Sequence, residues 1–159
     1  MILIKNSQRK IKVNLKKLKS DAQKILDLLD YADFDLGIWL TTNKTIHKYN
    51  KTFRDKDKPT DILSFPNYPD LKPGEHIVAE IEEEKNLGDL IISLEYVQKA
   101  AKDLDEDFEL RLQMLLVHGI CHLLGYDHIK DEDFELMRQK EEFLLKELGA
   151  THTAWPSLR

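Results

Sequence analysis

Cysteine is scarce in this chain: Cys121 is the only one among 159 residues. A single cysteine forms no internal disulfide, so the fold depends on a hydrophobic core, which a chain of this length is large enough to bury. Long hydrophobic runs are missing too, and none approaches the roughly 20 apolar residues of a membrane-spanning helix. The opening MILIKNSQRK has its charges after its apolar residues, the reverse of a secretory signal. We therefore expect a cytoplasmic protein with no membrane partner.

Negative charge prevails overall, but it is unevenly distributed. The formal net charge is −5. Residues 1–60 hold 14 basic and 7 acidic residues, a net of +7, whereas the remainder holds 10 and 22, a net of −12. One basic group consists of Lys44, Lys48, Lys51, Arg54, Lys56 and Lys58. Such a group can neutralise nucleic-acid phosphates, although lysines on an exposed face also serve solubility alone.

Three histidines stand at a spacing typical of metal ligands in the segment HGICHLLGYDH. His118 and His122 are four residues apart, so on a helix they share one face and can chelate one ion. Gly125 favours the left-handed conformation that ends a helix, after which the chain can return His128 to the same point. Three neutral imidazoles suit zinc, and a fourth position left for water is typical of a catalytic site. We predict one zinc ion bound by His118, His122 and His128.

The surroundings of these histidines favour metal binding over ordinary packing. Residues 114–124 read MLLVHGICHLL without a charge, which predicts a helix through the middle of the domain. An unpaired polar group buried there costs about 1–3 kcal/mol, so two on one face call for a ligand. Cys121 lies on the same helix and is better interpreted as a small core residue than as a redox group.

The histidine spacing also matches the metzincin peptidase signature HExxHxxGxxH at its three histidines and its glycine. Those peptidases place a proton-accepting glutamate directly after the first histidine. This chain has Gly119 there, which cannot act as a base. A zinc-dependent peptidase thus remains an alternative, but the missing glutamate of the metzincin signature weakens it.

Three segments together resemble the YbeY family of metal-dependent endoribonucleases. HGICHLLGYDH is similar to the family's HGxxHLxGYDH, NKTFRDKDKPTDILSFP at 50–66 to its arginine loop and PTDVLSF, and LGDLIIS at 87–93 to its LGDIxIS strand. The resemblance implies cleavage of single-stranded ribosomal RNA, notably in 16S 3′-end maturation and ribosome quality control, with ribosomal proteins as partners. It also places Arg54 at the family's motif arginine. A guanidinium grips a phosphate through two hydrogen bonds, so Arg54 is our candidate catalytic residue, neutralising charge that develops on the phosphate.

Hydrophobic periodicity predicts strands early in the chain and helices late. The expected strands cover 2–5, 34–41, 62–65 and 87–93, and the expected helices cover 20–31 with Ser20 as N-cap, 43–53, 93–104, 108–124 and 132–148. This order predicts an α+β fold in which a mixed four-stranded sheet carries helices around a central metal-binding helix. We expect a single domain over 1–159, with Trp155 packing back onto it.

A third interpretation is a ribosome-assembly binding module whose zinc is structural. In that case chelation unfolds the domain instead of only abolishing an activity. Asp61 and Asp89 lie in the two upstream motifs, where a role in the site and ordinary turn or strand-end hydrogen bonding are equally open.

Overall fold

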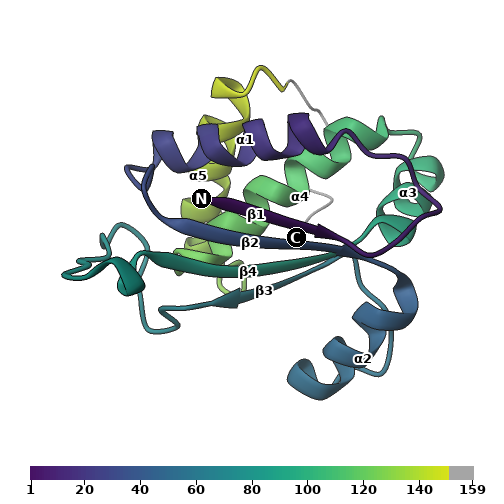
Figure 1. Ribbon diagram of the computed structural model, residues 1–159, viewed down its shortest axis with the longest axis horizontal. Helices are drawn as coiled ribbons and strands as arrows, with labels where there is room; N and C mark the ends of the chain where they lie inside the picture. Colours follow the sequence, from purple (N-terminus) through teal and green to yellow (C-terminus); the bar gives the residue numbers. More distant parts are fainter. Residues whose placement is uncertain (151–159) are drawn as a thin grey trace.

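The computed structural model of the protein describes residues 1–150, so Trp155 and the rest of the tail lie outside the described residues. The elements in chain order are β1 (Ile2–Asn6), α1 (Leu15–Leu28), β2 (Asp35–Thr41), α2 (Asn43–Arg54), β3 (Ile62–Pro66), the 3-10 helix η1 (Glu82–Glu84), β4 (Asn86–Ser93), α3 (Leu94–Asp103), α4 (Phe108–Leu123) and α5 (Asp131–Glu147). Figure 1 shows their arrangement around one sheet.

The four strands form a single mixed sheet in the order β1-β2-β4-β3. Strand β2 pairs in parallel with both β1 and β4, whereas β3 pairs antiparallel with β4 and forms one edge. The 67–85 connection between β3 and β4 includes η1 and projects from one end of the sheet (Figure 1). The predicted α+β fold with a mixed four-stranded sheet is confirmed.

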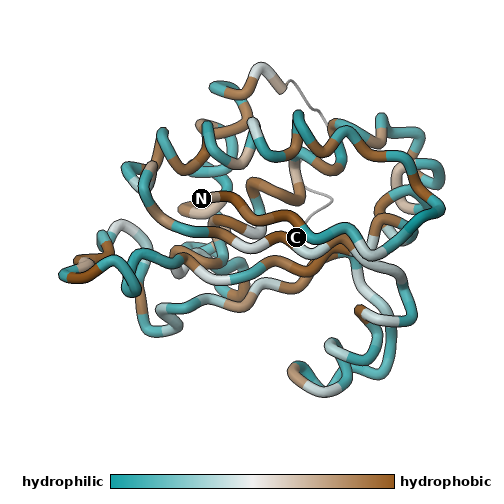
Figure 2. Tube along the Cα trace, viewed as in Figure 1, coloured by the Kyte–Doolittle hydropathy of each residue, from teal (hydrophilic) through white to brown (hydrophobic). Residues whose placement is uncertain are grey.

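The two faces of the sheet carry very different amounts of hydrophobic packing. Alternate residues of a strand point to opposite faces, and Leu36, Ile38 and Leu40 of β2 enter the main core together with residues of α1 and α4. On the opposite face a small cluster of Ile46, Leu63 and Ile91 packs under α2. In Figure 1, α2 accordingly lies across the sheet from α1. Figure 2 shows hydrophobic residues concentrated in the strands and α4, while α1 turns a hydrophilic side outward.

Helix α4 is the central helix of the domain, as its sequence predicted. Twelve of its sixteen residues are buried, including His118, Gly119 and Cys121. An apolar helix of this kind needs partners on several sides, and α4 packs against the sheet, α1, α3 and α5.

The predicted start of the first helix is wrong. Helix α1 begins at Leu15 instead of Ser20, and the side chain of Asn14 caps it by accepting a hydrogen bond of 3.0 Å from the Lys17 amide. Leu18 extends the buried stripe of Ala22, Ile25 and Leu26 by one turn, because residues four apart share a helix face. The lysines around Leu18 concealed that stripe in the sequence. The other predicted helices and strands are confirmed to within one or two residues at most ends.

No helix within residues 1–150 is long and apolar enough to cross a membrane. The buried hydrophobic cluster extends from Ile2 to Ala150. The extent of the single domain, 1–159, stays a prediction.

Candidate metal centre

Helix α4 places the rings of His118 and His122 against each other. One turn separates the two residues, and their Nε2 atoms lie 3.1 Å apart. The rings are nearly perpendicular, with centroids 4.5 Å apart. His118 is 7% exposed, so its imidazole is held in the interior of the protein.

The turn after α4 brings in the third histidine. Gly125 has φ +92°, and hydrogen bonds run from the Gly125 amide to the His122 carbonyl and from the Tyr126 amide to the Cys121 carbonyl, which together form a Schellman ending. A Cβ atom at Gly125 would lie 2.0 Å from the Leu71 carbonyl oxygen, so only glycine fits. His128 then returns to the cluster, with its ring centroid 5.3 Å from that of His118 and 5.1 Å from that of His122. One nitrogen from each of the three rings lies within 4.8 Å of the others.

The remaining nitrogens of the two helix histidines point away from the cluster and have partners of their own. His118 Nδ1 lies 2.9 Å from Glu141 Oε2 on α5, and His122 Nδ1 lies 2.9 Å from the Tyr126 carbonyl oxygen. An Nδ1–H that donates to these oxygens leaves Nε2 with its lone pair facing the cluster. Hydrogen bonds of this kind are usual around metal-ligating histidines, because they fix both the tautomer and the ring orientation.

Glu141 is not among the site residues predicted from the sequence. Its side chain is 4% exposed and stands on the buried stripe of α5 with Met137, Leu144 and Leu145. Acidic residues are almost never fully buried unless they are paired. A glutamate within an apolar helical stripe was therefore the signal that could have identified it.

Burial keeps both helix histidines neutral. Desolvation, with a smaller contribution from His128, lowers the pKa of His118 to about 4. Desolvation and the two neighbouring histidines lower the pKa of His122 to about 3. Desolvation also raises the pKa of Glu141 to about 8. Neutral imidazole is the form that binds a metal, so the site disfavours protons as competitors for the Nε2 positions.

The donor set fits a zinc ion. Two nitrogens at the usual zinc–nitrogen distance of about 2.0–2.1 Å in a tetrahedral site lie about 3.3 Å apart. The Nε2 atoms of His118 and His122 are 3.1 Å apart, close to this spacing. Three imidazoles without a fourth protein ligand also leave one coordination position open.

Gly119 faces the sheet and not the histidine cluster. A Cβ atom at this position would lie 2.7 Å from Ile62 Cδ1 and 2.9 Å from Leu90 Cδ2. The absence of a side chain at residue 119 lets the helix pack closely on β3 and β4, and the Ser64 hydroxyl lies 3.4 Å from the Gly119 carbonyl oxygen. A glutamate in the peptidase position would start toward the sheet and not toward the cluster, and Ile62 and Leu90 would have to shift to admit it.

Arg54 lies outside the cluster, as the last residue of α2. Asp55 ends the helix in the left-handed conformation, with φ 54°, and the side-chain Nδ2 of Asn50 donates to the Lys58 carbonyl at 2.8 Å, which ties the following loop to the helix. Within residues 1–150 the Arg54 guanidinium is exposed and makes no ion pair or hydrogen bond. The structure thus leaves this guanidinium available to an external anion.

The two motif aspartates occupy different sides of the sheet. Asp61 accepts a hydrogen bond of 2.7 Å from the Ile62 amide at the start of β3, and its charge acts to raise the pKa of His118. Asp89 is exposed, and its side chain lies over Gly37. A Cβ atom added at Gly37 would be 2.1 Å from Asp89 Oδ1. Asp61 therefore belongs to the surroundings of the cluster, and Asp89 belongs to the opposite face.

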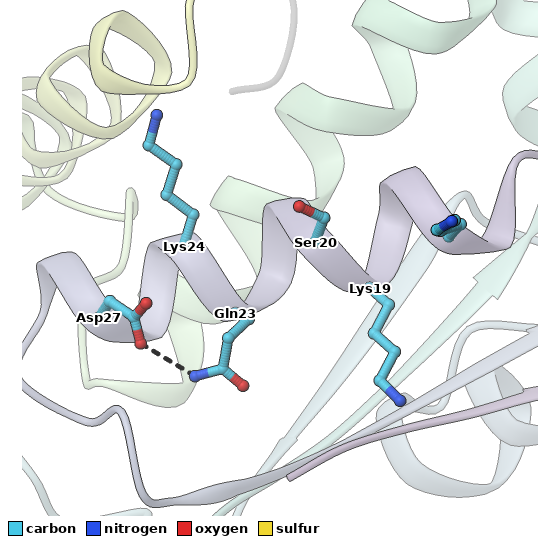
Figure 3. Close-up of a pocket in the computed structure, with 6 residues that line it drawn as sticks. Lys19, Ser20, Gln23, Lys24 and Asp27 are labelled. Atoms are coloured by element: carbon cyan, nitrogen blue, oxygen red, sulfur yellow. Dashed lines mark hydrogen bonds between the residues drawn. The ribbon is translucent and has the colours of Figure 1, made fainter.

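A hollow lies along the outer side of α1, but its polar groups do not converge. It is lined by Lys16, Lys19, Ser20, Gln23, Lys24 and Asp27. Figure 3 shows Lys19 and Lys24 extending in different directions and Gln23 bonded to Asp27, at 2.9 Å. Ligand sites gather polar groups around a concave and largely apolar surface, so this hollow is a poor candidate for a ligand site.

An α+β fold with three histidines gathered at one helix end defines this chain as a candidate metalloprotein. The family model described as Endoribonuclease YbeY matches residues 3–149. The chain is 38% identical to the human endoribonuclease YbeY over 148 residues, covering 93% of this chain and 88% of the relative. It is 40% identical to that of Fusobacterium nucleatum over 141 residues, covering 87% and 76%. The solution structure of TM1509 from Thermotoga maritima is similar with a TM-score of 0.57 and 26% identity, over 94% of this chain and 92% of that one.

This protein belongs to the YbeY endoribonuclease family. The resemblance found in three short motifs therefore extends over nearly the whole chain.

Proposed function

We propose that this protein is a zinc-dependent endoribonuclease that cleaves single-stranded ribosomal RNA. The observation that carries the proposal is the arrangement of imidazoles. The neutral rings of two histidines have their Nε2 atoms 3.1 Å apart and their Nδ1 atoms each in contact with an oxygen, and a third ring lies beside them. The relatives that match this chain are named endoribonucleases, and that name supplies the class of substrate.

His118, His122 and His128 would hold the ion, and Glu141 would keep His118 in the tautomer that exposes Nε2. When bound, zinc supplies a Lewis acid for a phosphate oxygen and makes water a better nucleophile near neutral pH. Arg54 binds the phosphate through its planar, permanently charged guanidinium and stabilises the negative charge that grows on the non-bridging oxygens.

The biological setting that we propose is 16S 3′-end maturation and ribosome quality control in the cytoplasm, with ribosomal proteins as partners. The support for this setting is family membership, and the basic first third of the chain provides the charge that an RNA substrate requires.

The test is cleavage of an end-labelled single-stranded RNA by the wild type, by His118→Ala and by His76→Ala, each with and without a chelator. His76 stacks on Tyr31, away from the cluster, and its variant controls for the loss of one imidazole. We expect cleavage by the wild type and His76→Ala, and none by His118→Ala or after chelation. Cleavage that survives both His118→Ala and chelation would refute the proposal. Chelation that unfolds a protein without nuclease activity would favour the binding module with structural zinc.

Arg54 is tested separately. We expect Arg54→Ala to retain its zinc and to lose about 10²- to 10³-fold in kcat/KM, the usual effect of removing one charge-stabilising group. Arg138→Ala is the matched control, because Arg138 is a surface arginine on α5 paired with Glu142 at 2.6 Å. Full activity of Arg54→Ala would remove Arg54 from the mechanism.

A further inference from the structure

Four aromatic rings form a continuous row on the sheet face that carries α2. Trp39 of β2 meets Tyr49 of α2 at 5.6 Å between centroids, Tyr49 stacks on Phe53 at 6.0 Å, and Phe53 meets Phe65 of β3 edge-on at 5.3 Å. All three spacings lie in the favourable range for aromatic pairs. We call these four residues the aromatic row.

Phe53 is not accounted for by the hydrophobic packing beneath α2. The buried cluster there consists of Ile46, Leu63 and Ile91, with Trp39, Tyr49 and Phe65 partly buried against it. Phe53 is 62% exposed, although a phenylalanine gains stability mainly by leaving water. A half-open aromatic surface of this kind offers ring area to a ligand.

The surroundings of the aromatic row are positively charged. Helix α2 has no acidic residue, and its cations are Lys44, Lys48, Lys51 and Arg54. On the strand side, Lys5 Nζ stands 4.7 Å from the centre of the Trp39 ring. Asp57, beyond the helix, is engaged by His47 at 2.7 Å and Lys51 at 3.9 Å. Asp89 of β4 is paired with Phe65 of β3, and its negative charge bounds this positively charged surface.

We propose that the aromatic row binds a segment of the single-stranded RNA substrate, with an unpaired base stacked on Phe53 and the α2 lysines beside its phosphates. This inference rests on the proposed function and adds a second contact region to it. Aromatic rings that accept base stacking within a cationic surface are the usual means of binding single strands without sequence preference. The charge of α2 favours this occupant over an acidic or purely apolar partner.

Strand β3 lies between the aromatic row and the helix that carries the histidine cluster. Ile62 and Ser64 of this strand face Gly119, the neighbour of His118, whereas Leu63 and Phe65 face α2. Strand β3 is also an edge of the sheet, so no further strand blocks the passage from one face to the other. The substrate would cross this edge, with its base on Phe53 lying beyond the cleaved phosphate that Arg54 contacts.

The test compares the zinc-loaded wild type with Phe53→Ala, Phe53→Leu and Phe53→Trp on a series of single-stranded RNAs of increasing length. Phe143→Ala is the matched control, because Phe143 is a 45% exposed phenylalanine on α5. Stacking of one base is worth about 1–3 kcal/mol, so Phe53→Ala should raise KM about 5- to 150-fold on long RNAs. Its kcat should stay near that of the wild type. On RNAs too short to cross β3, Phe53→Ala and wild type should be equal.

The replacements at Phe53 separate stacking from simple hydrophobic contact. Phe53→Trp should restore the low KM and Phe53→Leu should not, because leucine has no aromatic face. Equal KM values for wild type and Phe53→Ala on long RNAs, or full rescue by leucine, would overturn the inference while the nuclease activity stands. A wild type that cleaves no RNA of any length would instead overturn the proposed function, and this inference with it.

Discussion

Glu141→Gln is the replacement that best isolates how the fold prepares the histidine cluster. Glu141 reaches His118 from α5, 23 residues along the chain, and the 2.9 Å contact is buried. Glutamine keeps the size of the side chain and one oxygen acceptor, but it cannot ionise to the carboxylate that raises the basicity of a metal-bound imidazole. Zinc should therefore bind more weakly to a site whose three ligands are unchanged.

The expected size of the effect follows from the position of Glu141 behind a ligand. Removing a hydrogen-bond partner of a metal-ligating histidine typically weakens metal binding 10- to 100-fold, or about 1.4–2.7 kcal/mol. The thermal stability of the metal-free protein should not fall along with the zinc affinity. Burial lowers the pKa of His118 to about 4 and raises that of Glu141 to about 8, so both groups are neutral there at pH 7 and the replacement exchanges one neutral side chain for another. Metal-free Glu141→Gln should unfold at a temperature no lower than that of the wild type.

The assay is competition for zinc between the protein and a chromophoric chelator, together with thermal unfolding of the metal-free forms. Glu142→Gln is the matched control, because Glu142 is the adjacent residue and forms a surface ion pair with Arg138. A zinc affinity within twofold of the wild type would refute the role of Glu141. A loss of affinity accompanied by an equal loss of metal-free stability would show that the replacement only disrupts packing.

Three further predictions concern the surroundings of the cluster. Gly125→Ala should destabilise the protein by more than the roughly 1–2 kcal/mol that an alanine in the left-handed conformation costs, because its Cβ meets the Leu71 carbonyl. Urea unfolding checks this beside Gly149→Ala, a position with positive φ but open space around it. Equal losses of unfolding free energy in the two variants would contradict the prediction. Cys121 is fully buried with a raised pKa, so iodoacetamide should label it only after denaturation, as mass spectrometry would show. In the metal-free protein the lowered pKa values of His118 and His122, about 4 and 3, predict that neither ring gains a proton between pH 7 and 5, as ring ¹⁵N NMR shifts would show. A protonation midpoint near 6.5, as in an unfolded chain, would contradict the burial argument.

The fold is most predictable from the sequence where local rules decide the structure. The strand periodicities and the apolar run of α4 identified the sheet and the central helix, because alternation and helical spacing are properties of neighbouring residues. The start of α1 was wrong because Asn14 and Ser20 are both good N-caps, and the choice between them depends on whether Leu18 reaches the core. The core comprises residues from across the chain, so the local sequence could not decide the position of that cap.

The sequence by itself determined the three-histidine cluster. Spacing on one helix turn aligns His118 with His122, and Gly125 ends the helix so that the chain brings back His128, all within eleven residues. Only the tertiary structure decided what surrounds it. Glu141 behind His118, Ile62 and Leu90 against Gly119, and the aromatic row that joins β2, α2 and β3 all come from segments far apart in sequence. Such contacts depend on how helices pack on the sheet and on which strand forms its edge, and no local periodicity encodes either.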